Sequence, residues 1–65
     1  MSRVQYIDSI TVGNTKLILW NRGNYQYQIE TKIKDTTKVF NFEAEYNEAV
    51  CEFIMQASKL NKQMA

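Results

Sequence analysis

A chain of 65 residues is long enough for one small domain, and no linker, internal repeat or low-complexity tract divides residues 1–65. The sequence has no histidine and a single cysteine, which excludes an internal disulfide and a structural zinc site. The net charge of +1 argues against a strong overall attraction to nucleic acid or anionic lipid.

The first ten residues lack the continuous apolar segment of a signal peptide, and no stretch approaches the about 18 apolar residues of a membrane span. A lone cysteine also suits a reducing compartment. We therefore expect a cytoplasmic protein without a membrane contact. The abundance of Asn, Lys, Ile and Tyr and the absence of proline are typical of A+T-rich genomes and suggest a phage or another mobile element.

Four segments predict β-strands, because they are dense in β-branched and aromatic residues and are bounded by turn residues. They cover about residues 3–12, 15–20, 24–34 and 37–42. The turns between them are Gly13-Asn14, Asn21-Arg22-Gly23 and Asp35-Thr36. Strict alternation of apolar and polar residues in the third segment predicts two chemically distinct faces.

Turn length sets the register of each hairpin. We expect Gly23 to adopt a left-handed conformation in a three-residue turn, since a two-residue turn at Arg22-Gly23 would bury Gln26 and Gln28. The three turns then predict these cross-strand pairs: Ile10 with Leu17, Leu19 with Tyr25, Leu17 with Tyr27, Ile29 with Phe42, and Thr31 with Phe40. In the first segment, the apolar phase changes between Ile7 and Ile10, which suggests a bulge or a late start of the strand.

One face of the predicted sheet is apolar and forms the core. Its members are Ile10, Val12, Leu17, Leu19, Tyr25, Tyr27, Ile29, Ile33, Phe40 and Phe42. Residues 45–62 predict an amphipathic helix that covers this face, with an apolar arc about 100° wide. That arc contains Tyr46, Ala49, Val50, Phe53, Ala57, Leu60 and Met64. The predicted fold is therefore α+β: a four-stranded antiparallel meander with one C-terminal helix on one face, or ββββα.

The opposite face of the sheet has no further segment to cover it, and we interpret it as a partner-binding surface. An aromatic residue surrounded by amides and cations is typical of interaction sites. The predicted binding residues are Lys16, Ile18, Trp20, Arg22, Gln26, Gln28 and Lys32. The alternative is that Trp20 only packs along its neighbours on the sheet.

Two kinds of partner fit this face. A protein partner would use Trp20 and Ile18 as apolar anchors. Single-stranded DNA or RNA would stack a base on Trp20 and place phosphates beside Lys16, Arg22 and Lys32. A single tryptophan and the small net charge favour the protein partner.

A second candidate surface lies on the predicted helix, away from the core. Small and flexible side chains there could pack against a second copy of the chain, and a domain of this size gains from the extra burial. The predicted dimer interface is Cys51, Ile54, Met55 and Ser58.

The sequence predicts no catalytic residues, no cofactor and no metal site. Cys51 has no histidine to activate it, and the nearby Glu48 and Glu52 oppose a thiolate. We therefore expect a small non-enzymatic binding protein, a homodimer that regulates or inhibits a protein partner by steric occlusion. Single-stranded nucleic-acid binding is the alternative.

Overall fold

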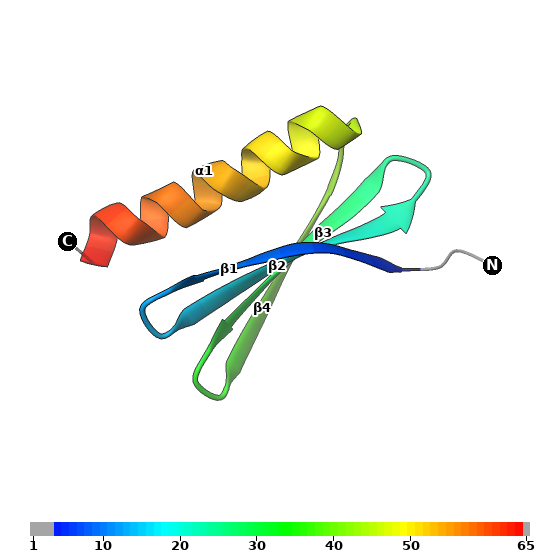
Figure 1. The fold of residues 1–65 in the computed structure, drawn as a ribbon. Helices are drawn as coiled ribbons and strands as arrows, with labels where there is room; N and C mark the ends of the chain where they lie inside the picture. Colours follow the sequence, from blue (N-terminus) through cyan, green and yellow to red (C-terminus); the bar gives the residue numbers. More distant parts are fainter. Residues whose placement is uncertain (1–3, 65) are drawn as a thin grey trace.

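The computed structural model describes residues 4–64, with side chains for residues 4–62. It contains four antiparallel strands in a single sheet and one C-terminal helix (Figure 1), which confirms the predicted ββββα fold. The elements are β1 (Gln5–Val12), β2 (Thr15–Gly23), β3 (Gln26–Ile33), β4 (Thr36–Glu43) and α1 (Tyr46–Met64). The strands follow one another across the sheet in the order β1-β2-β3-β4.

The first hairpin has the predicted turn and pairing. Gly13 has a φ of 59°, a left-handed value that glycine adopts without steric cost. Ile10 pairs with Leu17. The predicted irregularity of the first strand is a bulge between Tyr6 and Asp8, whereas residue 3, where the prediction began, lies outside the described residues.

The second hairpin turns later than predicted. Asn24 and Tyr25 form the turn with φ values of 51° and 62°, and Leu19 pairs with Ile29 instead of Tyr25. Two consecutive left-handed residues match the twist of the flanking strands, and this turn lets β2 extend to Gly23. Gly23 is left-handed as predicted (φ 88°), but it lies in a bulge at the end of β2.

The third hairpin turns earlier than predicted. The turn is Lys34-Asp35, so Ile29 pairs with Phe40 rather than Phe42, and Thr36 joins the strand. A β-branched residue is better accommodated in a strand than in a turn. Both register errors are even numbers of residues, and an even shift leaves every side chain on the same face of the sheet.

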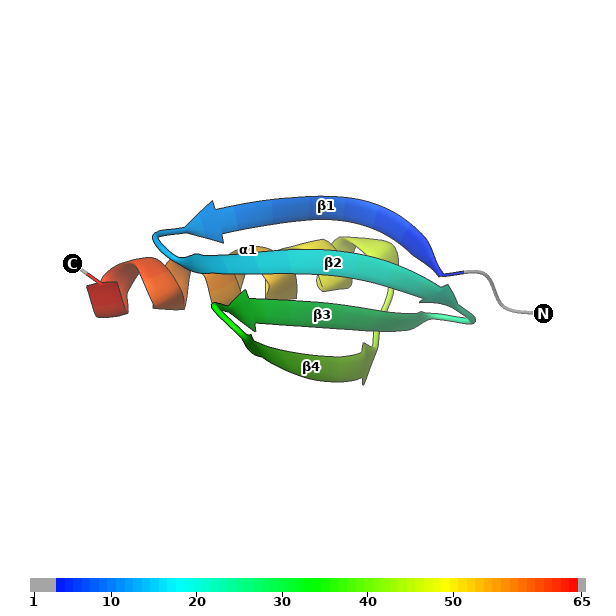
Figure 2. The ribbon, with the colours of Figure 1, turned by 90° about the horizontal axis from the view of Figure 1, so that it is seen from below.

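The core lies between the sheet and α1. Its buried members are Leu17, Leu19, Tyr27, Ile29, Ala49, Phe53 and Ala57, with Ile7, Ile10, Phe42, Val50 and Leu60 packed against them. The helix contacts mainly β1 and β2, and Figure 2 shows β4 at the far side of the sheet, beyond the helix.

Four predicted core residues are exposed, because the helix lies off-centre over the sheet and because the second hairpin turns at Tyr25. Tyr25 is 67% exposed in the turn, Phe40 on β4 is 49% exposed, and Ile33 and Tyr46 are also exposed. Val12 is partly buried, and the side chain of Met64 lies outside the described residues.

Candidate binding surfaces

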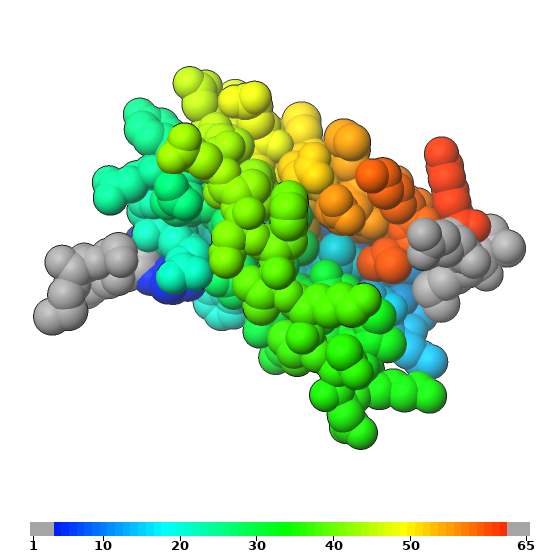
Figure 3. All heavy atoms as spheres, turned by 180° about the vertical axis from the view of Figure 1, so that it is seen from behind, coloured from blue at the N-terminus to red at the C-terminus, as the bar shows by residue number. Residues whose placement is uncertain are grey.

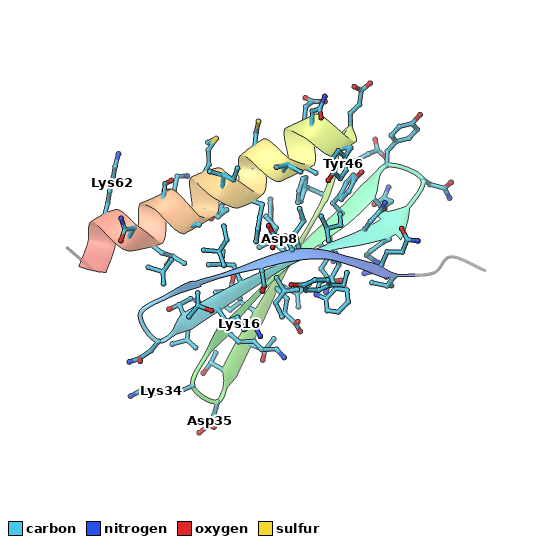
Figure 4. All side chains as sticks on the ribbon, in the orientation of Figure 1. Asp8, Lys16, Lys34, Asp35, Tyr46 and Lys62 are labelled. Atoms are coloured by element: carbon cyan, nitrogen blue, oxygen red, sulfur yellow. The ribbon has the colours of Figure 1, made fainter. Side chains whose placement is uncertain are left out.

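The open face, defined here as the face of the sheet away from α1, carries the predicted binding residues. In Figure 4, Lys16 lies on this side of the sheet. Lys16 pairs with Lys32, and Trp20 pairs with Gln28. The Arg22 guanidinium donates a hydrogen bond from Nη1 to Gln28 Oε1 at 3.1 Å. The register therefore gathers the predicted residues of β2 and β3 on one surface, which no described element covers.

Trp20 has an aromatic neighbour that the sequence prediction missed. The rings of Tyr6 and Trp20 meet edge to face, with centroids 5.8 Å apart and an interplanar angle of 79°. Tyr6 is 58% exposed and donates from its hydroxyl to Ser9 Oγ at 3.1 Å. The change of apolar phase in the first strand was the available signal, because the bulge that it indicates puts Tyr6 opposite Trp20.

Trp20 itself is partly buried, and its indole Nε1 is shielded from solvent without a hydrogen-bond partner among the described residues. The T-shaped contact with Tyr6 is a favourable arrangement of aromatic quadrupoles. Trp20 is therefore held in a packed position and presents only part of its ring to a partner.

Ile18 is only 7% exposed although it lies on the open face, because its neighbours on the sheet cover it. It supplies little contact area. Tyr6 and Val39 are more exposed apolar side chains of this face; Val39 is 51% exposed and pairs with Glu30. Val39 on β4 is thus a second contact residue that the prediction did not include.

The charges on the open face have both signs. Lys16, Lys32 and Arg22 share it with Glu30 and with Glu43, whose Oε2 accepts a hydrogen bond from Gln26 Nε2 at 3.0 Å. A mixed surface of this kind gives orientation to a protein contact and attracts a polyanion only weakly.

A hollow of about 370 Å³ lies at the end of the open face near the β2–β3 turn. It is lined by Arg22, Gly23, Asn24, Gln26 and Asn41. The lining is polar and contains no pair of groups arranged for acid–base catalysis. It enlarges the polar rim around Trp20.

A second hollow, of about 360 Å³, lies on the helix side of β4. It is lined by Phe40, Phe42, Ala44, Glu48 and Glu52. Phe40 stacks on Phe42 with ring centroids 5.3 Å apart, and Phe42 stacks on Tyr27 at 6.1 Å. The two phenylalanines of β4 and the two glutamates of α1 thus line the same hollow, beside the strand that the helix does not cover.

The helix stripe, defined here as Cys51, Ile54, Met55 and Ser58, is exposed along its whole length. Ile54 is set apart from the other three, because it lines a hollow of about 260 Å³ together with Ile7, Ile10 and Tyr46 beside β1. The stripe is therefore narrower on its outward side than the sequence predicted.

Between residues 4 and 64, no helix combines the length and the apolar character needed to cross a membrane. The described residues contain no group of three or more His, Cys, Asp or Glu side chains that could hold a metal ion. Comparison with protein-family models, curated proteins and solved structures gives no significant match.

Proposed function

We propose that this chain is a small non-enzymatic binding protein that contacts another protein through the open face of its sheet. The observation that carries the proposal is the uncovered Tyr6–Trp20 pair, framed by amides and cations of β2 and β3. Aromatic anchors within a polar rim are the usual centre of a protein interface.

The anchors are fixed before a partner arrives. Tyr6 is held by its ring contact with Trp20 and its hydroxyl contact with Ser9, and Arg22 is held by Gln28. Side chains that are already ordered lose less conformational entropy on binding. A face whose contact residues are already ordered suits steric occlusion of a partner's surface, which is how a small regulator or inhibitor acts.

Four further features belong to this proposal. Cys51 is exposed on α1, and the sequence has no histidine that could activate its thiol, which supports a non-enzymatic role. The lone cysteine supports a cytoplasmic location, and the Asn- and Lys-rich composition supports a phage or mobile-element origin. The small apolar area that a short chain can bury by itself supports self-association as a homodimer.

The test is affinity capture with wild-type protein and variants, followed by mass spectrometry of the recovered proteins. We expect Tyr6→Ala and Trp20→Ala each to weaken capture of a defined protein at least about tenfold, because each truncates a central anchor. Met55→Ala on the far side of α1 is the matched control and should not change recovery. Circular dichroism must show that all variants are folded. Equal recovery by all of them would contradict the proposal.

Single-stranded nucleic acid is the second candidate. The sequence prediction had only Trp20 on this face, and the contact of Tyr6 with Trp20 adds a second aromatic ring that supports this candidate. Two aromatic rings beside Lys16 and Arg22 could stack bases and contact phosphates. Glu30 on the same face and the net charge of +1 oppose it. Because of these charges, we rank nucleic-acid binding below protein binding.

Fluorescence of the single tryptophan separates the two candidates. Under the protein-binding proposal, a mixed-sequence single-stranded oligonucleotide leaves the Trp20 emission unchanged even at low salt. A change that disappears steeply as salt rises, and that is lost in Lys16→Glu, would instead identify nucleic acid as the ligand. Lys62→Glu, at the end of α1, is the control for a non-specific loss of charge.

A further inference from the structure

The outer strand β4 has a free side along its whole length. Among the described residues it pairs only with β3, and that pairing runs from Thr36 to Glu43 without a bulge. Figure 3 shows β4 at the surface below α1, with no other described segment across it. A regular strand of this kind offers a row of unpaired backbone groups to another strand.

The direction of those backbone groups follows from one hydrogen bond. The N–H of Ala44 donates to the carbonyl of Tyr25 at 2.9 Å, toward the β3 side. Because backbone groups alternate along an antiparallel strand, Thr36, Lys38, Phe40 and Phe42 also bond to β3. The N–H and C=O groups of Thr37, Val39, Asn41 and Glu43 therefore point outward.

The other outer strand, β1, is protected. Its bulge between Tyr6 and Asp8 breaks the regular spacing of backbone groups. The Asp8 carboxylate also accepts the N–H of Ser9 at 2.8 Å, which occupies a donor on the free side of β1. A bulge and a charged side chain are devices that prevent strand addition. β4 has neither a bulge nor a capped donor among its described residues.

Both faces of β4 carry an exposed apolar side chain. Phe40 lies on the helix side and Val39 on the open face, and each is about half exposed. A strand that continued the sheet beyond β4 would cover part of both side chains. Backbone pairing and apolar burial would then act together at this position.

We propose that a second copy of the chain pairs antiparallel with β4 about a two-fold axis at Phe40. An axis perpendicular to the sheet requires outward-pointing residues to meet one another. Centred on Phe40, Val39 meets Asn41 and Thr37 meets Glu43 of the second copy, so all four outward residues are used. An axis at Val39 or at Asn41 leaves one of them unpaired. This inference deepens the homodimer of the proposed function and rests on self-association alone, not on the open-face partner.

Charge complementarity identifies the second copy as the occupant. In this register, Lys38 lies opposite Phe42 of the second copy, at the mouth of the hollow whose wall contains Glu48 and Glu52. The two-fold axis creates this ammonium–carboxylate contact twice. A lysine on an outer strand ordinarily discourages pairing, but here it meets opposite charge. Phe40 meets Phe40 of the second copy at a non-hydrogen-bonded position, where side chains approach most closely.

The pairing has a consequence for the open face. An axis perpendicular to the sheet keeps the open faces of both copies on the same side of one continuous sheet. The dimer would therefore present two Tyr6–Trp20 pairs to a partner. The helices would both lie on the opposite side.

The sharpest test is Val39→Pro, with Val39→Thr as its matched control. Proline removes the outward N–H at position 39, which β3 does not use, and proline is tolerated on an outer strand at such a position. Threonine replaces one methyl group of Val39 by a hydroxyl, so the side chain becomes more polar, but it keeps the N–H. Sedimentation equilibrium of the full chain at tens of micromolar should give a dimer for wild type and Val39→Thr, and a monomer for Val39→Pro.

A charge exchange provides a second test that does not depend on proline. Lys38→Glu should weaken self-association at least about tenfold, since it places carboxylates together. Adding Glu48→Lys and Glu52→Lys to that variant should restore the dimer. Met55→Glu on the helix stripe should leave the dimer unchanged.

Each outcome decides for or against the β4 interface. A monomeric wild type, or a dimer lost in Met55→Glu but kept in Val39→Pro and Lys38→Glu, would overturn it. In the first case β4 would be free for an extended segment of another protein, and in the second the helix stripe would be the interface. Partner capture that depends on Trp20 would survive either result, so failure of this inference is distinct from failure of the proposed function.

Discussion

Phe53 is the largest fully buried side chain among the described residues, and only 2% of it is exposed. The position could be predicted because the helical period of 3.6 residues aligns it with Ala49 and Ala57, which are also buried. The exposure of Phe40 could not be predicted, because alternation along a strand gives the face on which a residue lies but not the position of the helix over that face.

Replacing Phe53 by alanine should destabilise the domain by about 3–5 kcal/mol through lost burial and a cavity. That amount is comparable to the entire stability expected for a domain of this size. Circular dichroism and urea titration should therefore find Phe53→Ala largely unfolded. Met55→Ala, at an exposed position on the same helix, should stay within about 0.5 kcal/mol of wild type. Equal stability of the two variants would refute the position of the core.

The three hairpins belong to the scale of elements, and they differ in how well the sequence specifies them. Gly13-Asn14 is a strong two-residue turn signal, and its register was predicted. The segment from Asn21 to Tyr25 offers several turns, and the structure combines a bulge at Gly23 with a turn at Asn24-Tyr25. Local residue preference alone cannot rank these options, because the choice depends on how much strand each one lets pair.

Tyr25 has a left-handed φ of 62°, which a side chain with a Cβ adopts at a steric cost. Tyr25→Gly should therefore stabilise the domain by about 0.5–1 kcal/mol, also because Asn-Gly is the preferred sequence for such a turn. Gly23→Ala should destabilise the domain by about 1 kcal/mol, since Gly23 has a left-handed backbone in the bulge. Thermal unfolding of both variants checks the prediction. Opposite signs are required, and destabilisation by Tyr25→Gly would argue against this turn.

At the scale of the whole molecule, the off-centre helix divides the sheet into two regions. β2 and the middle of β3 are covered, whereas β4 is exposed on both faces except for Phe42, which is partly buried. Local stability should follow this division, because amides under packed apolar contacts exchange only on global unfolding.

Amide hydrogen exchange should be slowest at Leu17 and Leu19 and should alternate along β4. Val39 and Asn41 should exchange rapidly in dilute protein, because their N–H groups point outward, whereas Phe40, bonded to β3, should exchange more slowly. At high protein concentration, Val39 and Asn41 should become protected as β4 pairs. Uniform exchange along β4 at all concentrations would contradict both the strand geometry and the pairing.

The sequence by itself determined the number and order of the elements, the two faces of the sheet and the buried face of the helix. These follow from the periods of 2.0 and 3.6 residues, and they survived two errors of register because an even shift preserves the faces. Only the tertiary structure decided where the helix lies across the sheet, which turn each hairpin uses, and that Tyr6 reaches Trp20. Those depend on how elements pack at a distance, and packing energy is shared among residues that no local pattern connects.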